Sequence, residues 1–369
     1  MKRYDIAIVG AGMVGASLAA EVAPHASVLL LEAEDTPGYH STGRSAAFWS
    51  ETYGGPGIQP LTTASGPALQ AGGFLAPLGS LHIGRAADAA AVDAFLAEFA
   101  GSGLVLERID PAELIPGLRP EWSLGVLEAS SAYIDVAALH ADCLARARRA
   151  GVDLVLDAPL RAAARVGDGW RIEAGAGEYS AAILVDAAGA WADRVAEIAG
   201  VAPIGIQPYR RTIAQLRTDP AAPADLPHVA DISGRFYFKP EHGRVWLSPH
   251  DETPVDPGDV QPEDLDIAIA IDRFEQVVDW RVATVERKWA GLRSFAPDRL
   301  PVYGFDPAEP AFFCCAGQGG FGIQTAPAGA ALAAALLLGR VPDPMLSAID
   351  PTRYAPGRFS ALARGGSAR

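Results

Sequence analysis

The chain has few cysteines and no pattern of metal ligands. Only Cys143, Cys314 and Cys315 are cysteines among its 369 residues, and three thiols at these spacings make neither a disulfide framework nor a four-thiolate zinc site. The seven histidines contain no HxxxH pair. These absences exclude a disulfide-stabilised secreted domain and the common zinc centres, and they favour a reducing, cytoplasmic compartment.

Positive charge is also scarce. Acidic residues outnumber basic ones 44 to 30, which gives a formal net charge of −14, and no long Lys/Arg run is present. We therefore expect no nucleic-acid partner. Half of the residues are hydrophobic and a fifth are charged, so the chain can bury a full core as two compact units or one large α/β body.

No hydrophobic run is long enough to span a membrane. Residues 326–338 are nearly all Ala and Leu but are followed by Gly-Arg, whereas a span needs roughly 20 residues. The apolar N-terminus is interrupted by Asp5, a glycine turn and Glu21, which is unlike a signal peptide. We expect a buried helix over 326–338 and no integral membrane segment.

The N-terminus has the pattern of a dinucleotide-binding unit. An apolar strand over 5–9 is followed by Gly10-Ala11-Gly12-Met13-Val14-Gly15, an Ala-rich helix to about residue 22 and a second strand that ends in Glu32. The three glycines suit a tight turn, a close approach of pyrophosphate to the helix N-terminus, and packing of helix on strand. Glu32 suits the ribose hydroxyls and argues against a 2′-phosphate.

Two later segments are also rich in small residues. Residues 37–47 read PGYHSTGRSAA and residues 317–324 read GQGGFGIQ, each leading into a helix pattern. Such turns would present backbone N–H groups to a second phosphate or to a ring that becomes anionic on reduction. Three helix starts of this kind predict a long cofactor with two head groups.

The remaining patterns divide the chain into two domains. We predict an α/β fold in which a Rossmann-type cofactor domain, residues 1–50, 130–205 and 288–369, carries an inserted α+β substrate domain built on an antiparallel sheet, residues 51–129 and 206–287. The first insertion is expected to be irregular apart from one helix near its middle. Residues 356–369 are expected to be a solvated tail.

Motifs along nearly the whole chain resemble one flavoprotein family. They are GAGMVGAS, LLEAEDTPGYHSTGRSAA, AAILVDAAGAW, QPYRRT, FYFKP, DVQPEDLDIA, WAGLRSFAPD and GQGGFGIQT. They are similar to those of the FAD-dependent D-amino acid oxidase superfamily, which includes glycine oxidase and sarcosine oxidase, and most of all to bacterial D-arginine dehydrogenase. The resemblance implies a Rossmann-type FAD domain and a sheet domain that holds an amino acid against the flavin.

The same resemblance implies which residues bind FAD. Sarcosine oxidase ties its flavin to a cysteine near the segment that is 291–298 here, and this chain has none there, so the FAD is expected to be non-covalent. The expected cofactor residues are Gly10, Gly12, Met13, Val14, Gly15, Glu32, Ala33, Thr42, Gly43, Arg44, Ser45, Ala46, Ala188, Gly189, Trp191, Gly319, Gly320, Phe321, Gly322, Ile323 and Gln324.

A second set of residues is expected to contact the substrate. The set is Tyr53, Tyr237, Arg211, Arg293 and Phe48. An α-carboxylate in a closed pocket needs a bidentate cation, and a guanidinium supplies the matching fork. Strand alternation favours Arg211 over its neighbour Arg210 without deciding between them.

Two departures from the dehydrogenase bear on the substrate. Phe48 stands where that enzyme has an active-site histidine, and Ser80 where it has the glutamate that binds the guanidinium of arginine. A pocket edged by Phe48 and Trp246, without that acid, favours an apolar or aromatic side chain. Ordinary core packing of Phe48 is equally compatible with the sequence.

The sequence thus predicts FAD-dependent oxidation of a D-amino acid to the imino acid, which is hydrolysed to a 2-oxo acid and ammonia. The Cα hydride passes to the flavin once the amine is neutral, so no protein base is required. The alternatives are a secondary amine or imino acid substrate, a 2-hydroxy acid substrate, and a non-catalytic flavin-bearing subunit. The sequence does not decide between dioxygen and quinone as electron acceptor.

Overall fold

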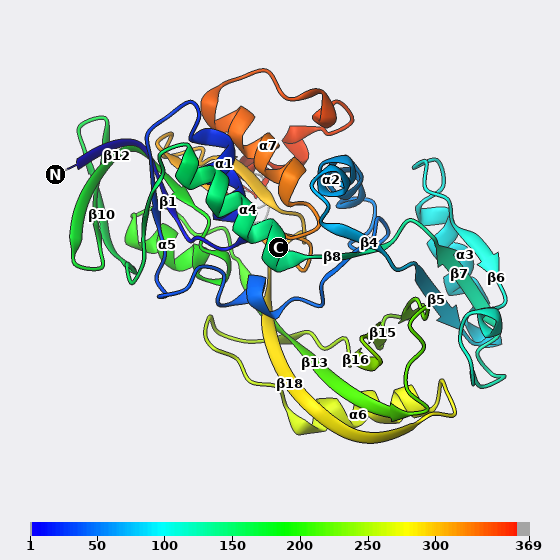
Figure 1. Ribbon diagram of the computed structural model, residues 1–369. Coiled ribbons are helices and arrows are strands. Elements are labelled where there is room, and N and C mark those ends of the chain that lie inside the picture. The colour runs from blue at the N-terminus through cyan, green and yellow to red at the C-terminus, as the bar shows by residue number, and fades with distance from the viewer. Residues whose placement is uncertain (1, 360–369) are drawn as a thin grey trace, which may run out of the picture.

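The structure is a computed structural model that describes residues 2–359. Two sheet-based units lie side by side, one around β1 and α1 and the other around the long strands β13 and β18 (Figure 1). The helices are α1 Met13–Val22, α2 Gln59–Ala71, α3 Ala89–Glu98, α4 Val136–Arg149, α5 Ala192–Ile198, α6 Asp264–Glu275 and α7 Ala326–Leu338.

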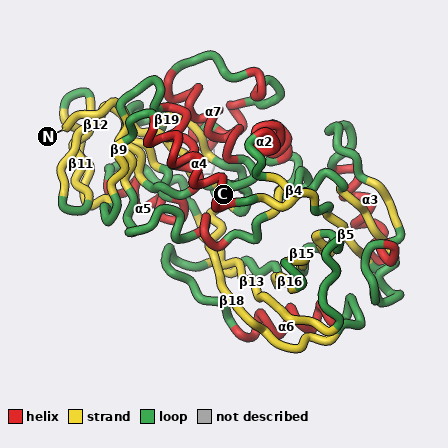
Figure 2. Tube along the Cα trace, viewed as in Figure 1, coloured by secondary structure: helices red, strands yellow, loops and turns green. Residues whose placement is uncertain are grey.

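The first unit is built on an eight-stranded sheet with a parallel centre. Its strands are β1 Lys2–Val9, β2 Val28–Leu31, β9 Asp153–Val155, β10 Leu160–Val166, β11 Gly169–Ala174, β12 Gly177–Asp186, β19 Val302–Phe305 and β20 Phe312–Ala316. Along β1, Ile6 and Ile8 pack toward α1 and α7, whereas Ala7 and Val9 pack toward α5. Figure 2 shows α4 and α7 grouped on one side of these strands. The predicted Rossmann-type architecture is confirmed.

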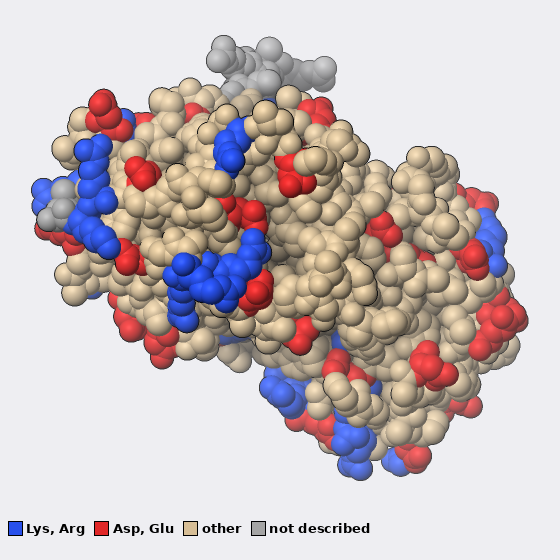
Figure 3. Space-filling model, turned by 45° about the horizontal axis from the view of Figure 1, so that its top comes forward, with Lys and Arg blue, Asp and Glu red and all other residues tan. Residues whose placement is uncertain are grey.

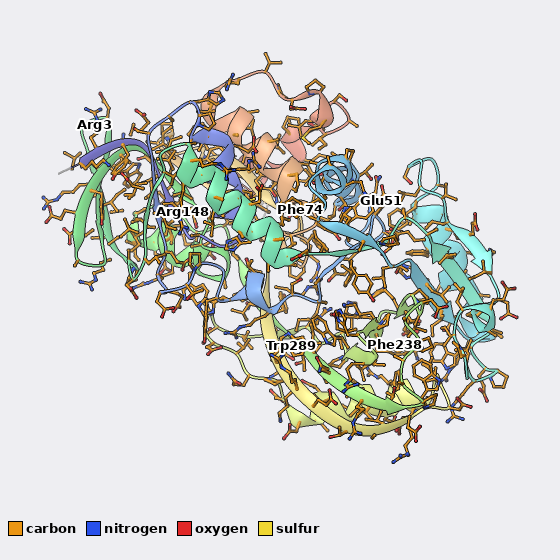
Figure 4. All side chains as sticks on the ribbon, viewed as in Figure 1. Arg3, Glu51, Phe74, Arg148, Phe238 and Trp289 are labelled. Atoms are coloured by element: carbon orange, nitrogen blue, oxygen red, sulfur yellow. The ribbon has the colours of Figure 1, made fainter. Side chains whose placement is uncertain are left out.

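The second unit is built on a ten-stranded sheet that is antiparallel except where β14 pairs with β5. Its strands are β5 Ser80–Gly84, β6 Glu107–Ile109, β7 Leu124–Glu128, β13 Gln207–Asp219, β14 His228–Asp231, β15 Tyr237–Glu241, β16 Arg244–Ser248, β17 Thr253–Pro254, β18 Arg281–Phe295 and β21 Gln318–Gly319. Phe238, labelled in Figure 4, packs against Phe274 of α6 in its core. A small sheet joins β3 Phe48–Trp49, β4 Leu75–Pro77 and β8 Ala132–Ile134.

Helix α2 was not predicted from the sequence. Pro60 stands in its first turn, where a missing N–H leaves no bond unmade, and Pro67 lies inside the helix, where proline normally removes a backbone hydrogen bond. Two prolines in one segment therefore concealed the helix. Leu61 joins the core that contains α7, so α2, although it belongs to the first predicted insertion, packs against the Rossmann-type unit.

Helix α7 spans the predicted residues 326–338 and is largely buried. It ends at Gly339, which has φ +61°, a left-handed conformation that favours glycine at this position. Within residues 2–359, no helix combines the length and the hydropathy needed to cross a bilayer. The expectation of a solvated tail over 356–369 is wrong for its first residues, because Pro356–Phe359 form a 3₁₀ turn in which Pro356 is buried and Phe359 packs against the core that contains α5. Residues 360–369 lie outside the described part of the chain.

Charged side chains of both signs share the surface. On the face in Figure 3, groups of Lys and Arg lie beside Asp and Glu. Some acidic groups are buried instead. One of them, Asp186, is 2% exposed at the end of β12, where it accepts a 3.1 Å hydrogen bond from the backbone N of Ala188. Burial raises the pKa of Asp186 from 3.8 to about 8, so the carboxyl is protonated at neutral pH.

Asp186 should make the protein less stable as the pH rises. Between pH 4 and 8 the folded chain holds a proton on Asp186 that the unfolded chain has released, so the free energy of unfolding falls by up to about 1.4 kcal/mol per pH unit. We expect Asp186→Asn, which keeps the acceptor oxygen, to flatten the decline in melting temperature from pH 5 to 8. Asp168→Asn, on the exposed turn between β10 and β11, is the control. Parallel melting profiles for the wild type and Asp186→Asn would contradict this assignment.

Candidate functional site

A cavity of about 420 Å³ is lined by residues of both units. The Rossmann-type unit contributes the loop between β1 and α1, the segment after β2, and the turn between β12 and α5. The second unit contributes residues of β13, β15 and β18, and residues 318–324 complete the wall. The three segments rich in small residues therefore meet at one site, as the sequence predicted.

The glycine loop is built by close backbone contacts. Gly10 has φ +100°, and a Cβ there would lie 2.5 Å from the carbonyl O of Ala187. A Cβ on Gly15 would lie 1.8 Å from the carbonyl O of Gly10, whereas one on Gly12 would meet only Thr42 Oγ1, at 3.3 Å. Gly10 and Gly15 thus serve the packing of the loop, and Gly12 keeps the cavity side open.

Glu32 secures this loop from the end of β2. Its carboxylate accepts a 2.8 Å bond from the N of Ala11 and a 3.1 Å bond from the N of Glu34. Gly12, the N-cap of α1, has no capping side chain, and Thr42 Oγ1 accepts from the N of Met13 at 3.0 Å. The remaining N–H groups of the first turn are an anion site of the kind that binds pyrophosphate.

The segment after β2 closes the same end of the cavity. Arg44, in the 3₁₀ turn Ser41–Arg44, pairs with Asp259 at 2.6 Å, so its charge is already balanced. Trp289 of β18, labelled in Figure 4, donates to the carbonyl O of Arg44 at 3.2 Å. His40 lines the cavity, bonds Glu34 through Nε2 at 2.8 Å, and has a buried Nδ1 without a partner. His40 was not among the predicted cofactor residues.

Three predicted cofactor residues do not line the cavity. Gly15 packs against the loop backbone, and the N of Gly43 bonds the carbonyl O of Gly38 at 2.8 Å. Phe321 joins a hydrophobic cluster with Ile58 and Phe295. All other predicted cofactor residues line the cavity, although the Gln324 amide is engaged with backbone and side-chain groups of residues 50–62.

All five predicted substrate residues line the cavity. The Phe48 ring lies 5.0 Å from that of Tyr53 and 6.0 Å from that of Tyr237. The Arg293 guanidinium lies 5.7 Å from the Tyr53 ring, and Arg211 and Arg293 both contact Glu252. The structure thus brings together two aromatic hydroxyls, one apolar ring and two cations.

Arg211, and not Arg210, lines the cavity. Arg211 is only 6% exposed, donates from Nε to the carbonyl O of Asp251 at 2.9 Å, and has no partner for its buried Nη1. Burial and the neighbouring Arg293 lower the pKa of Arg211. Arg210 points elsewhere, to the carboxylates of Asp251, Glu263 and Asp266.

Arg293 lies on β18 beside Gly320. It is 7% exposed, donates from Nη1 to Glu252 at 2.6 Å, and has a buried Nε without a partner. A Cβ on residue 320 would lie 2.3 Å from this Nε, so any side chain larger than that of glycine would force the guanidinium to shift. Two buried cations that share one cavity and retain unpaired donors are costly unless a ligand supplies an acceptor.

The apolar end of the cavity differs in part from the prediction. Phe48 lines it and stacks on His228 at 4.4 Å, and Ser80 lies behind, bonded to His228 at 2.9 Å. The expectation that Trp246 edges the cavity is wrong, because its ring covers the buried Lys239 at 4.4 Å. Phe48 thus lines the cavity, and its role as a wall for the substrate side chain stays a prediction.

Within residues 2–359, His40 is the histidine that lines the cavity, and it is bonded to Glu34. His82 and His250 do not line the cavity, and burial lowers the pKa of each to about 4. His250 Nδ1 bonds the carbonyl O of Gly234 at 2.6 Å, and His82 packs against Phe95. Both have structural partners within the protein.

Several lining residues were missed by the sequence reasoning. Most are small or apolar residues at strand ends and on α5, and no motif distinguishes them from core positions. The missed residues include Ala158, Pro159, Leu160, Arg194, Val195, Ile198, Ile213, Leu292, Ser294 and Gln318.

Comparison with known proteins assigns the family. Residues 5–336 match the family described as DAO, FAD dependent oxidoreductase. The chain belongs to this family. Mitochondrial dimethylglycine dehydrogenase of Homo sapiens is 26% identical over 397 residues, which cover 95% of this chain but 44% of that protein. The chain therefore spans less than half the length of dimethylglycine dehydrogenase.

Two solved structures have the same fold as this chain over nearly its whole length. Glycine oxidase from Geobacillus kaustophilus has a TM-score of 0.81 at 22% identity, with 96% of this chain and 99% of that chain covered. L-proline dehydrogenase from P. horikoshii has a TM-score of 0.84 at 20% identity, with 98% and 99% covered. These likenesses show the fold, and the similarity to D-arginine dehydrogenase stays a prediction.

Because the chain belongs to a family of FAD-dependent oxidoreductases, its cofactor is FAD. The residues that line the cavity fit this cofactor. The first turn of α1, whose N-cap Gly12 has no capping side chain, suits the pyrophosphate, and His40, whose buried Nδ1 has no partner, lines the same cavity. Residues 319, 320 and 322–324, which line the cavity with Arg293, would adjoin the flavin ring.

Proposed function

We propose that the chain oxidises α-amino carboxylates, specifically D-amino acids with an apolar or aromatic side chain, to imino acids that water converts to 2-oxo acids and ammonia. One observation carries the proposal. Arg211 and Arg293 are both buried on one cavity, and each retains an unpartnered nitrogen. A carboxylate is the ligand that matches paired guanidinium donors.

The protein's own residues bind and orient this substrate. The two guanidiniums hold the carboxylate, and the hydroxyls of Tyr53 and Tyr237 stand beside it as further donors. Burial raises the pKa of Tyr237 despite the nearby Arg211, so its hydroxyl keeps its proton. When bound, FAD would supply the hydride acceptor for the carbon that carries the amine. Positioning of that carbon is the task of the anchor and of the apolar wall.

The surroundings of the anchor support an uncharged side chain. Phe48, Ile213 and Leu292 line the cavity together with the anchor. Among the described lining residues the acids are Glu32 and Glu34, and both are engaged at the end of β2. A cationic side chain would therefore have no partner near Phe48, and its burial would be unfavourable.

A secondary or tertiary amine on the same carboxylate skeleton is the second candidate. The similarity to dimethylglycine dehydrogenase and L-proline dehydrogenase favours it, and the anchor would serve either substrate. A 2-hydroxy acid would use the same carboxylate contacts. A non-catalytic role would leave Arg211 Nη1 and Arg293 Nε without an acceptor, which argues against it. We propose that FAD is held without a covalent bond to cysteine, because Cys143, Cys314 and Cys315 are buried away from the cavity.

Anaerobic reduction of the bound flavin tests the proposal. The purified protein is mixed with D- and L-amino acids, N-methyl amino acids, proline and 2-hydroxy acids, and the loss of flavin absorbance is followed. We expect D-phenylalanine or D-leucine to reduce it fastest and D-arginine at least tenfold more slowly, because an unpaired buried cation is costly. Faster reduction by D-arginine would contradict the reading of Phe48, and reduction by N-methyl acids alone would support the second candidate.

A further inference from the structure

The anchor arginines share a carboxylate that lies outside the cavity. Glu252, on the loop between β16 and β17, accepts from Arg293 Nη1 at 2.6 Å and from Arg211 Nη2 at 3.4 Å through one oxygen. Glu252 is not among the residues that line the cavity. Its two bonds leave Arg293 Nε and Arg211 Nη1 without a partner.

The loop that carries Glu252 is fastened to β13. The Asp251 carboxylate accepts from the N of Thr212 at 2.7 Å and from the Thr212 hydroxyl at 2.9 Å. The carbonyl O of Asp251 accepts from Arg211 Nε at 2.9 Å. Arg211 is thus held at Nε and Nη2, and its Nη1 is the donor left without a partner.

A third arginine holds Glu252 in place from the solvent side. Arg299 Nη2 donates to both carboxylate oxygens of Glu252, at 2.8 and 3.0 Å. The Arg299 guanidinium lies 3.9 Å from the Phe295 ring. Although burial favours the neutral acid, Arg293, Arg299 and Arg211 hold the pKa of Glu252 below its usual value. The carboxylate is therefore ionised and fixed, as a charge-assisted network requires.

We propose that Glu252 is a positioning residue for the substrate carboxylate: it keeps the two mutually repelling guanidiniums together and leaves Arg211 Nη1 and Arg293 Nε free for the ligand. The inference rests on the proposed function. Without Glu252, each guanidinium loses a fixed partner and the pair separates. Part of the binding free energy is then used to order the two arginines, so the affinity for the substrate falls. The rate at which the bound substrate reacts is little changed.

The test compares Glu252→Ala, Glu252→Gln and Glu263→Ala. Glu263 also accepts from an arginine of β13, but from Arg210, away from the cavity, so Glu263→Ala is the matched control. Benzoate, a carboxylate that cannot be oxidised, is titrated while the flavin absorbance is followed, and the KM and limiting rate of anaerobic reduction are measured. FAD content and melting temperature are recorded for each variant.

We expect Glu252→Ala to raise the Kd for benzoate and the KM by about tenfold or more, with the limiting rate changed less than about threefold, since the loss is one of preorganisation. Glu252→Gln, which keeps an acceptor oxygen, should lie between Glu252→Ala and the wild type, and Glu263→Ala should match the wild type. An unchanged Kd in folded Glu252→Ala would overturn the inference. Tighter binding would also overturn it, since Glu252 would then be a competitor of the ligand.

The test separates this inference from the proposed function. If benzoate perturbs the wild-type flavin and Arg293→Ala weakens that binding, the carboxylate anchor stands, and a null result for Glu252→Ala overturns the role of Glu252 alone. If benzoate does not bind the wild type, or if Arg293→Ala leaves its Kd unchanged, the anchor itself is refuted and the proposed function fails.

Discussion

Replacement of Arg293 by alanine should weaken the binding of every carboxylate substrate at least a hundredfold while FAD stays bound. The guanidinium is 7% exposed and its Nε lacks a protein partner, so a substrate carboxylate would supply that partner within a buried site. Truncation of one member of a buried, hydrogen-bonded charge pair costs about 2–5 kcal/mol, and about 2.7 kcal/mol is a hundredfold in affinity. This is the largest effect that we expect from a single side chain of the substrate site.

The measurement should separate loss of the anchor from general damage. The KM for an amino acid and for its amide is determined by anaerobic flavin reduction in the wild type and in Arg293→Ala. We expect the preference for the acid over the amide to collapse in the variant, because only the acid uses the charge of Arg293. Arg287→Ala, on the exposed part of the same strand, is the control. A retained acid preference in Arg293→Ala would remove this residue from the site.

The cofactor end of the cavity could be predicted because its requirements are local. Gly10, Gly12 and Gly15 lie within six residues, and the strand, turn and helix around them fix how they meet a pyrophosphate. Helix α7 was equally predictable, since thirteen consecutive apolar or small residues end at a left-handed glycine. In both cases neighbouring residues alone determine the structure.

The substrate end depends on contacts between distant segments, which a single sequence does not contain. Arg210 and Arg211 are equally polar, and which of them faces the cavity is set by acidic residues about 40 to 56 positions away. Glu252 carries no motif, and its role arises only because its loop folds back onto β13. Trp246 was wrongly predicted to edge the cavity, because its large ring packs over Lys239 instead.

Gly12→Ala should abolish tight FAD binding and leave the apoprotein folded, whereas Gly15→Ala should prevent stable folding. A methyl group on Gly12 would meet only Thr42 Oγ1, at 3.3 Å, and Gly12 has φ −66°, which alanine adopts freely. The methyl would instead occupy the space that the pyrophosphate needs at the N-terminus of α1. On Gly15 the methyl would lie 1.8 Å from the backbone O of Gly10, so helix and loop would have to separate.

Matched measurements on three variants decide this prediction. FAD affinity is obtained from the quenching of flavin fluorescence on titration of apoprotein, and stability from thermal unfolding of the apoprotein. We expect Gly12→Ala to lose at least about a hundredfold in FAD affinity, because a displaced diphosphate forfeits several charge-assisted bonds, with a melting temperature close to that of the wild type. Gly258→Ala, which meets nothing within 4 Å, should change neither quantity. If Gly12→Ala bound FAD normally, the pyrophosphate could not lie against this turn, and the cofactor end of the cavity would have to be assigned elsewhere.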